Sequence, residues 1–182
     1  MTEFTNTWFK YSELSRDIYT HLYNLNEKRH ILEIGSHEGA SAYFFSNILL
    51  HHPESSLTCV DPYDIEDKTT PVTVNTKSLF LSNISYSSNH SKVSLLELYS
   101  NDFYKINTQM FDFIYIDGSH KVEDVINDFI NCFNILTING VLWFDDYGSG
   151  DIKQHIDLLY NSSYSEKLII IHQGYQIGFR KI

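Results

Sequence analysis

The chain is poor in cysteine and in basic residues, and each shortage argues against a class of protein. Its 182 residues include two cysteines, Cys59 and Cys132, and both lie in apolar stretches. Two such thiols are more simply explained as small core residues than as a disulfide or a nucleophile, so a reducing compartment is expected. Thirteen lysine and arginine residues against 23 acidic residues give a formal net charge of −10. That charge disfavours nucleic acid as a partner.

Long apolar segments are also missing. No run approaches the roughly 18 continuous apolar residues of a membrane-spanning helix, and the first residues show neither the basic start nor the apolar run of a signal peptide. We therefore expect a cytoplasmic protein with no membrane partner. The length suits a single domain over residues 1–182, with an N-terminal helix or lid in residues 1–28 and a core in residues 29–182.

Two short apolar runs in the second half of the chain organise the prediction of the fold. Residues 111–117 and 140–146 are rich in aromatic and branched side chains, which is typical of buried parallel strands. Between them, apolar residues recur at helical spacing over residues 122–136. The pattern predicts a crossover helix that ends at Asn139-Gly140.

Carboxylates follow directly after both of these predicted strands. Asp117 ends the first, and Asp145 and Asp146 end the second. In a right-handed strand–helix–strand unit, both carboxyl ends emerge at one edge of the sheet. We therefore expect the three acids to lie close together.

The remaining patterns predict more strands and helices of the same kind. Further strands are predicted at 30–34, 57–60 and 92–96, and further helices at 11–25, 76–84 and 151–159. Residues 167–182 are typical of two strands joined by a turn at Gln173-Gly174. The fold predicted is α/β, a Rossmann-like, doubly wound and mostly parallel seven-stranded sheet with a C-terminal antiparallel hairpin.

The turn after the first predicted strand has features of a nucleotide-type pocket. Glu33 closes that strand, and Gly35 and Gly39 allow the backbone to approach a ligand where a helix begins. Asp61 ends the neighbouring strand, where a carboxylate can bind both hydroxyls of a ribose. The glycine spacing does not match the dinucleotide fingerprint, and beside Glu33 an ammonium group fits better than a phosphate. The alternative is an ordinary strand-to-helix turn that happens to contain two glycines and an acid.

Four segments in order, LEIGSHEGAS, CVDPYD, FDFIYIDGSH and GVLWFDDY, resemble the motifs of class I S-adenosylmethionine-dependent methyltransferases. Over roughly residues 30–182 the chain is most similar to the metal-dependent O-methyltransferases of the catechol and macrocin types, and to the related group with D-G-S-H. The resemblance implies S-adenosylmethionine as cofactor. It also implies a cofactor site made of Glu33, Gly35, Ser36, His37, Gly39, Ser41, Asp61, Ser100 and Asp117.

The same resemblance implies that Asp117, Asp145 and Asp146 hold a divalent cation. Hard oxygen ligands suit Mg²⁺, with Mn²⁺ or Ca²⁺ as substitutes, and three clustered carboxylates repel one another without a cation. His120 stands where catechol-type enzymes carry a lysine base. A neutral imidazole accepts protons near physiological pH, so His120 and Asp117 are the predicted catalytic residues. Taken singly, each acid could instead be a turn or capping residue.

Together with the acids and His120, the resemblance implies a metal-assisted O-methyltransferase that acts on a hydroxyl of a small polyhydroxylated acceptor, such as a sugar. An NAD-type oxidoreductase is the first alternative, and the missing third glycine weakens it. A non-catalytic cofactor-binding scaffold is the second, and the intact set of acids with His120 argues against it. A homo-oligomer is compatible with the aromatic residues expected on the surface.

Overall fold

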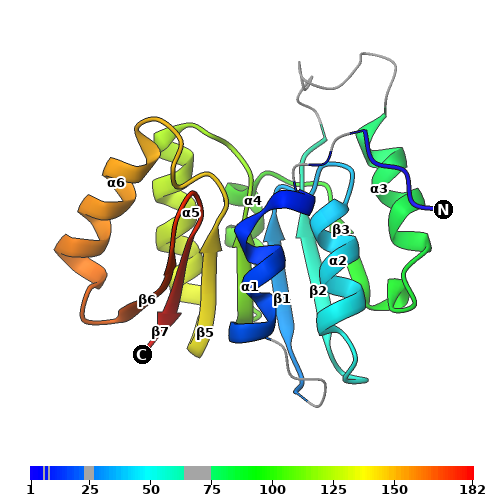
Figure 1. Cartoon of the computed structure of the whole chain (residues 1–182), viewed down its shortest axis with the longest axis horizontal. Coiled ribbons are helices and arrows are strands. Elements are labelled where there is room, and N and C mark those ends of the chain that lie inside the picture. The colour runs from blue at the N-terminus through cyan, green and yellow to red at the C-terminus, as the bar shows by residue number, and fades with distance from the viewer. Residues whose placement is uncertain (6, 8, 23–26, 64–74) are drawn as a thin grey trace.

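The computed structural model describes residues 1–5, 7, 9–22, 27–63 and 75–182, which form one sheet with helices on both faces (Figure 1). The strands are β1 His30–Ile34, β2 Ser56–Val60, β3 Val93–Leu96, β4 Phe111–Ile116, β5 Leu136–Phe144, β6 Leu168–Gln173 and β7 Ile177–Lys181. They lie in the order β3-β2-β1-β4-β5-β7-β6. Neighbours among β1 to β5 pair in parallel, whereas β7 pairs antiparallel with both β5 and β6. The predicted fold class, including its C-terminal hairpin, is confirmed.

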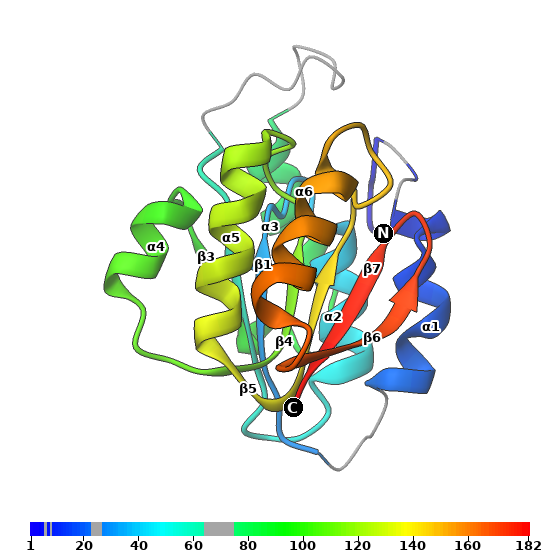
Figure 2. The same ribbon diagram turned by 90° about the vertical axis from the view of Figure 1, so that its left-hand side faces the viewer.

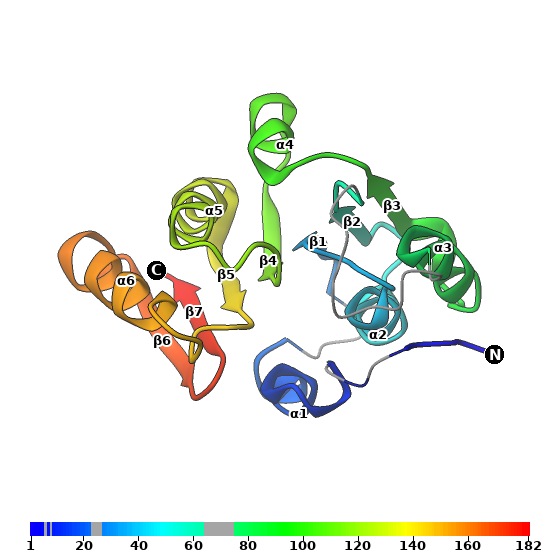
Figure 3. The same cartoon turned by 90° about the horizontal axis from the view of Figure 1, so that it is seen from above.

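Two helical layers cover the sheet (Figure 3). On one face lie α1 Glu13–His21, α2 Ala40–Leu49 and α3 Thr76–Ser85, and on the other α4 Ser100–Ile106, α5 Val122–Ile135 and α6 Ile152–Leu159. Three shorter helical segments are η1 Phe9–Tyr11, η2 His90–Lys92 and η3 Tyr160–Tyr164. Within the described residues, no helix combines the length and the apolar composition that a membrane span requires.

The central strands are buried on both sides because their side chains alternate between two apolar cores. In β4, Phe113 and Tyr115 pack with residues of α1, α2 and α3. Their neighbours Ile114 and Ile116 pack with residues of α4, α5 and α6. A parallel strand covered on both faces needs apolar residues at every position, which explains the continuous apolar runs of the sequence.

The predicted end of the helix before β5 is wrong. The helix α5 ends at Ile135 and β5 begins at once, so Asn139 and Gly140 lie inside the strand. The register between β4 and β5 shifts here, and Asn139 has a φ of 65°. A Cβ on Gly140 would lie 2.8 Å from the carbonyl oxygen of Thr137. The pair therefore forms an irregularity in the strand, where the same two residue types are favoured as after a helix.

The turn between β6 and β7 ties the C-terminal hairpin to α1, which lies beside it (Figure 2). Gln176 is 2% exposed, and its Oε1 accepts hydrogen bonds from the backbone N–H of Leu14 at 2.7 Å and from Nε1 of Trp143 at 3.0 Å. Its own backbone N–H donates to Oε2 of Glu13 at 2.7 Å. The bond from Leu14 satisfies one of the unpaired backbone donors at the start of α1, and together the bonds fix that helix against the hairpin.

We expect Gln176→Ala to lower the free energy of unfolding by about 2–4 kcal/mol, because two buried N–H donors lose their acceptor. Denaturant unfolding measures this change, and faster hydrogen exchange at Leu14 would locate it. Gln154→Ala, an exposed change on α6, is the matched control and should stay within about 0.5 kcal/mol. Equal effects of the two changes would show that the Gln176 contacts contribute nothing to stability.

Candidate active site

The glycine turn after β1 lies against the end of β4. Gly35 has a φ of 83°, and a Cβ placed on it would lie 2.0 Å from the carbonyl oxygen of Asp117. Nearby, the backbone N–H of Asp117 donates to the carbonyl oxygen of Ile34 at 2.8 Å. The atoms that such a Cβ would meet belong to the backbone of Asp117 and Gly118, so they cannot move aside for a side chain. The structure therefore brings the predicted cofactor turn and Asp117 into direct contact.

Glu33 stabilises this turn through hydrogen bonds with two serines. Its carboxyl group is 0% exposed and accepts hydrogen bonds from the hydroxyls of Ser36, at 2.7 Å, and of Ser41. Burial raises the pKa of Glu33 to about 7, although the serine hydrogen bonds act in the opposite direction. Glu33 therefore acts on the turn through the two serines, and the predicted contact with a cofactor stays a prediction.

Asp61 joins the end of β2 to the same turn. Its Oδ2 accepts hydrogen bonds from the backbone N–H groups of Ser36 and His37, both at 2.9 Å, and its Oδ1 accepts one from Tyr63 at 2.9 Å. The Tyr63 hydroxyl donates in turn to the carbonyl oxygen of His37 at 2.9 Å. Glu33, the glycine turn and Asp61 thus form one connected group, as the sequence predicted from their adjacent strand ends.

Ser100 faces a different neighbour. It is the first residue of α4, and its side chain hydrogen-bonds to Asp128 of α5. Asp128 is 2% exposed and also accepts from the hydroxyl of Tyr104 at 3.0 Å. Burial raises the pKa of Asp128 to about 6. This contact joins two helices, and the predicted place of Ser100 near an adenine ring stays a prediction.

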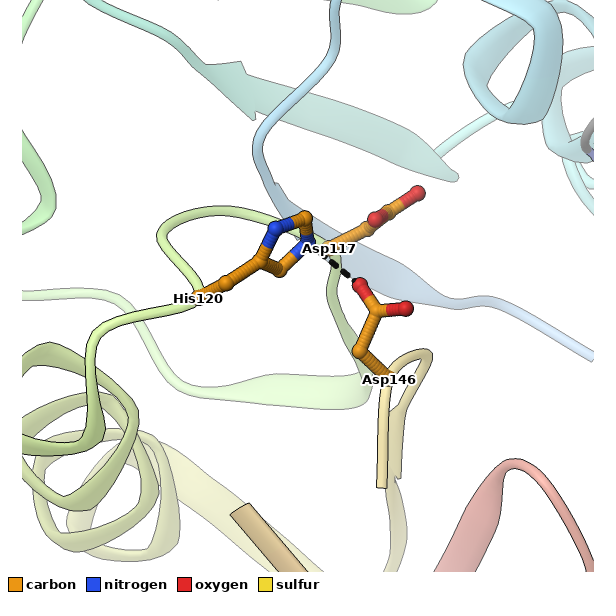
Figure 4. A group of neighbouring side chains, drawn as sticks. All are labelled: Asp117, His120 and Asp146. Atoms are coloured by element: carbon orange, nitrogen blue, oxygen red, sulfur yellow. Dashed lines mark ion pairs between the residues drawn. The ribbon is translucent and has the colours of Figure 1, made fainter. Parts of the chain in front are cut away.

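Three side chains meet where β4 and β5 end: Asp117, His120 and Asp146 (Figure 4). One potential ligand atom from each lies within 4.8 Å of the other two. His120 Nε2 is 2.5 Å from Asp146 Oδ2, and the His120 side chain is 65% exposed while that of Asp146 is 20% exposed. We call these three residues the acid–histidine group. The sequence predicted that Asp117 and Asp146 meet, but it assigned His120 as a base beside them.

Asp145 was predicted to complete the metal ligands, yet it points to a different set of partners. Its Oδ1 accepts hydrogen bonds from the Tyr115 hydroxyl at 2.8 Å and from the Gln176 side-chain amide. Both bonds fall on Oδ1, so they do not occupy Oδ2. Tyr115 was not predicted as a site residue, although it lies two residues before Asp117 and the alternation of β4 directs both side chains to the same side. Gln176 was not predicted either, because no pattern in the neighbouring sequence indicates its contact with Asp145.

The pKa values of the three acids reflect the crowding of carboxylates that are partly buried. Burial raises the pKa of Asp117 well above its usual range, and the neighbouring charges of Asp145 and Asp146 raise it further. Burial likewise raises the pKa of Asp145. Burial also acts to raise the pKa of Asp146, but the hydrogen bond and charge of His120, together with the hydrogen bond of Tyr175, lower it overall. The hydrogen bond with Asp146 raises the pKa of His120. Carboxylates that need protons or a cation to coexist are a suitable set for a divalent metal.

Two hollows differ in size and in their relation to these residues. A crevice of about 10 Å³ beside Asp117, His120 and Asp146 has room for about one water molecule or ion. A larger groove of about 630 Å³ lies between the N-terminal residues and α2, with Phe9 and Phe44 among its walls. None of the residues that line this groove is a predicted site residue. The smaller crevice is therefore the candidate site of reaction, because Asp117, His120 and Asp146 line it.

Comparison with known proteins identifies related folds. A family model described as a methyltransferase domain matches residues 32–147. No curated protein sequence matches the chain. A solved O-methyltransferase from Bacillus cereus, in complex with S-adenosylhomocysteine, has a TM-score of 0.68 and 14% identity and covers 100% of this chain and 84% of its own.

Two further solved structures have similar scores. The O-methyltransferase TomG from Streptomyces achromogenes, involved in tomaymycin synthesis and bound to S-adenosylmethionine, has a TM-score of 0.64 and 14% identity over 100% of this chain and 92% of that chain. An rRNA methylase from Streptococcus thermophilus has a TM-score of 0.67 and 8% identity over 99% of both chains. At these identities the likeness shows a common fold alone.

Glu33 should give the folded state a measurable dependence on pH. Because its folded pKa of about 7 exceeds its ordinary value of 4.5, the folded chain binds this proton more tightly, and stability falls as pH rises through that window. We expect Glu33→Gln to remove up to about 3 kcal/mol of this loss. Urea unfolding at pH 5 and pH 8 measures it, with surface Glu166→Gln as control. Parallel pH profiles for wild type and Glu33→Gln would contradict the assignment.

Proposed function

The chain belongs to the methyltransferase domain family, and we propose that it moves a methyl group from S-adenosylmethionine to a hydroxyl of a small polyhydroxylated acceptor, assisted by a divalent cation. The observation that carries this proposal is the contact between Gly35 and the backbone of Asp117. A donor at the glycine turn and an acceptor at the acid–histidine group would be neighbours there. Methyl transfer needs that proximity, because the attacking oxygen must lie in line with the methyl group.

The glycine turn supports the choice of donor. The O-methyltransferases from Bacillus cereus and Streptomyces achromogenes are complexes with S-adenosylhomocysteine and S-adenosylmethionine, respectively, and S-adenosylmethionine supplies a methyl group activated by its sulfonium charge. Asp61 would hold the ribose hydroxyls, and the turn from Gly35 to Gly39 would hold the methionine part. Asp61 already accepts two backbone hydrogen bonds from the turn, so this pocket is preorganised. The NAD-type alternative is not favoured by the family match.

The acids support the choice of metal. Asp117, Asp146 and the Oδ2 atom of Asp145 would hold Mg²⁺, or Mn²⁺ or Ca²⁺ in its place, because all three supply hard carboxylate oxygens. A bound divalent cation lowers the pKa of an acceptor hydroxyl and orients it. The partly buried, mutually repelling carboxylates fit such an ion. Sites of this kind suit a polyhydroxylated acceptor such as a sugar, since two adjacent hydroxyls can share one metal.

His120 would remove the proton of the acceptor hydroxyl. Its side chain is 65% exposed, so it can face an acceptor, and its Nε2 lies 2.5 Å from Asp146 Oδ2. Asp146 fixes the ring orientation through Nε2, and it stabilises the imidazolium that forms when the other ring nitrogen, Nδ1, takes the proton. The net charge of −10 argues for a small acceptor over a nucleic acid, whose phosphates the chain would repel.

We expect S-adenosylmethionine and S-adenosylhomocysteine to raise the melting temperature, and NAD to leave it unchanged. A ligand at 100 times its Kd stabilises the folded state by about 2.7 kcal/mol. Asp61→Asn should weaken S-adenosylhomocysteine binding by about 1–3 kcal/mol through lost charged hydrogen bonds. Calorimetry measures that affinity, with exposed Asp102→Asn of α4 as control. Stabilisation by NAD alone would refute the proposed donor.

The metal is tested by its removal. We expect EDTA to abolish turnover and to leave S-adenosylhomocysteine binding in place, because the carboxylate oxygens would hold the metal whereas the glycine turn and Asp61 would hold the cofactor. Asp146→Asn and Asp145→Asn should both weaken Mg²⁺ binding. His120→Ala should slow turnover by about 10²–10⁴-fold while Mg²⁺ still binds, because proton removal and coordination are different roles.

An exposed histidine elsewhere, changed in His51→Ala, controls for the loss of an imidazole. A loss of Mg²⁺ affinity in His120→Ala as large as that in Asp146→Asn would make His120 a ligand and not the base. A loss confined to Asp146→Asn would remove Asp145 from the ligands. Full activity in EDTA would end the metal part of the proposal.

A further inference from the structure

The turn between β6 and β7, residues 174–176, reaches the edge of the sheet where β5 ends (Figures 1 and 2). Two consecutive residues of this turn contact the two consecutive acids after β5. The Tyr175 hydroxyl donates to Asp146 Oδ1 at 2.9 Å. The side-chain amide of Gln176 donates to Asp145 Oδ1. The turn is thus part of the surroundings of the acids, although about 30 residues of chain separate it from them.

The position of Tyr175 is fixed by its neighbours. The backbone N–H of Gly148 donates to the Tyr175 carbonyl oxygen at 2.7 Å. A Cβ on Gly148 would lie 2.8 Å from the Tyr175 ring atom Cδ2 and 3.2 Å from its Cα. On the other side, buried Gln176 anchors the turn to α1 and β5. An aromatic ring held on a rigid support loses little freedom when a ligand contacts it.

More than half of Tyr175 is nevertheless open to solvent. The residue is 53% exposed, while its hydroxyl is already engaged by Asp146. The opposite oxygen of Asp146 faces His120. Tyr175 and His120 therefore flank the same carboxylate, and the aromatic ring of this half-exposed residue stands beside it. Such faces bind flat or ring-shaped groups by stacking.

We propose that Tyr175 is an acceptor-contact residue that selects acceptors in which the reacting hydroxyl is carried on a ring. The acceptor ring lies on the exposed face of Tyr175 while its hydroxyls point to Asp117 and Asp146. This inference rests on the proposed function and names the acceptor class, a cyclic diol. It also assigns the selecting residue to the C-terminal hairpin and not to the N-terminal segment. The large groove beside α2 lacks the acids that would act on a hydroxyl.

Calorimetry with two cyclic probes, catechol and glucose, tests this inference in the presence of Mg²⁺ and S-adenosylhomocysteine. An acyclic diol, 1,2-propanediol, serves as the third probe. We expect Tyr175→Ala to weaken binding of a cyclic probe about tenfold through the lost ring contact. Tyr175→Phe keeps the ring and should bind within about threefold of wild type. Binding of the acyclic diol should be the same in all three proteins.

Tyr86→Ala is the matched control, because Tyr86 of the α3 end is 54% exposed and lies outside the site. Unchanged affinity of Tyr175→Ala for both cyclic probes would overturn the inference, as would a wild-type protein that binds neither. If the probes turn over, a rise in KM with little change in kcat for Tyr175→Ala would support it. Failure of wild type to bind S-adenosylhomocysteine or Mg²⁺ would instead refute the proposed function, and probe affinity would still decide the role of Tyr175.

Discussion

The parallel pairing of β1 with β4 is the constraint on which the site depends. In the order β3-β2-β1-β4-β5, the chain extends the sheet one way from β1 and the other way from β4. Loops that leave the two strands diverge, and an opening remains above their carboxyl ends. Gly35 and Asp117 lie at this opening with their backbones in contact. The glycine turn and the acids are neighbours because of strand order, although more than eighty residues separate them in the sequence.

The carboxylates of Asp145 and Asp146, which crowd together at that opening, accept hydrogen bonds from different kinds of donor. Asp145 accepts hydrogen bonds from the uncharged groups of Tyr115 and Gln176, whereas Asp146 accepts one from His120, which can carry charge. The pKa values of the two adjacent acids are displaced in opposite directions: burial raises that of Asp145 despite its hydrogen bonds, whereas His120 and Tyr175 lower that of Asp146. Asp146 can therefore stay ionised beside His120, whereas Asp145 takes up a proton more readily because burial raises its pKa.

Periodicity and strand-end acids were sufficient to predict the sheet, the glycine turn beside Asp61, and the meeting of Asp117 with Asp146. These features follow from local patterns and from the handedness of crossover connections. The Asn139-Gly140 pair misled the prediction because its backbone preference suits a helix end and a strand irregularity equally. Tyr175 and Gln176 could not be predicted, since their partners depend on how the hairpin docks, and nothing in their own neighbourhood of sequence encodes that.

The insertion of β7 between β5 and β6 has a consequence for the order in which the protein matures. On the ribosome, β5 emerges well before its antiparallel partner, and its edge stays unpaired until residues 177–181 have left the exit tunnel. Asp145 and Asp146 acquire their contacts with residues 175 and 176 only at that stage. The contacts around these acids therefore form last during synthesis. A chain that ended before residue 177 would lack β7, an interior strand of the sheet.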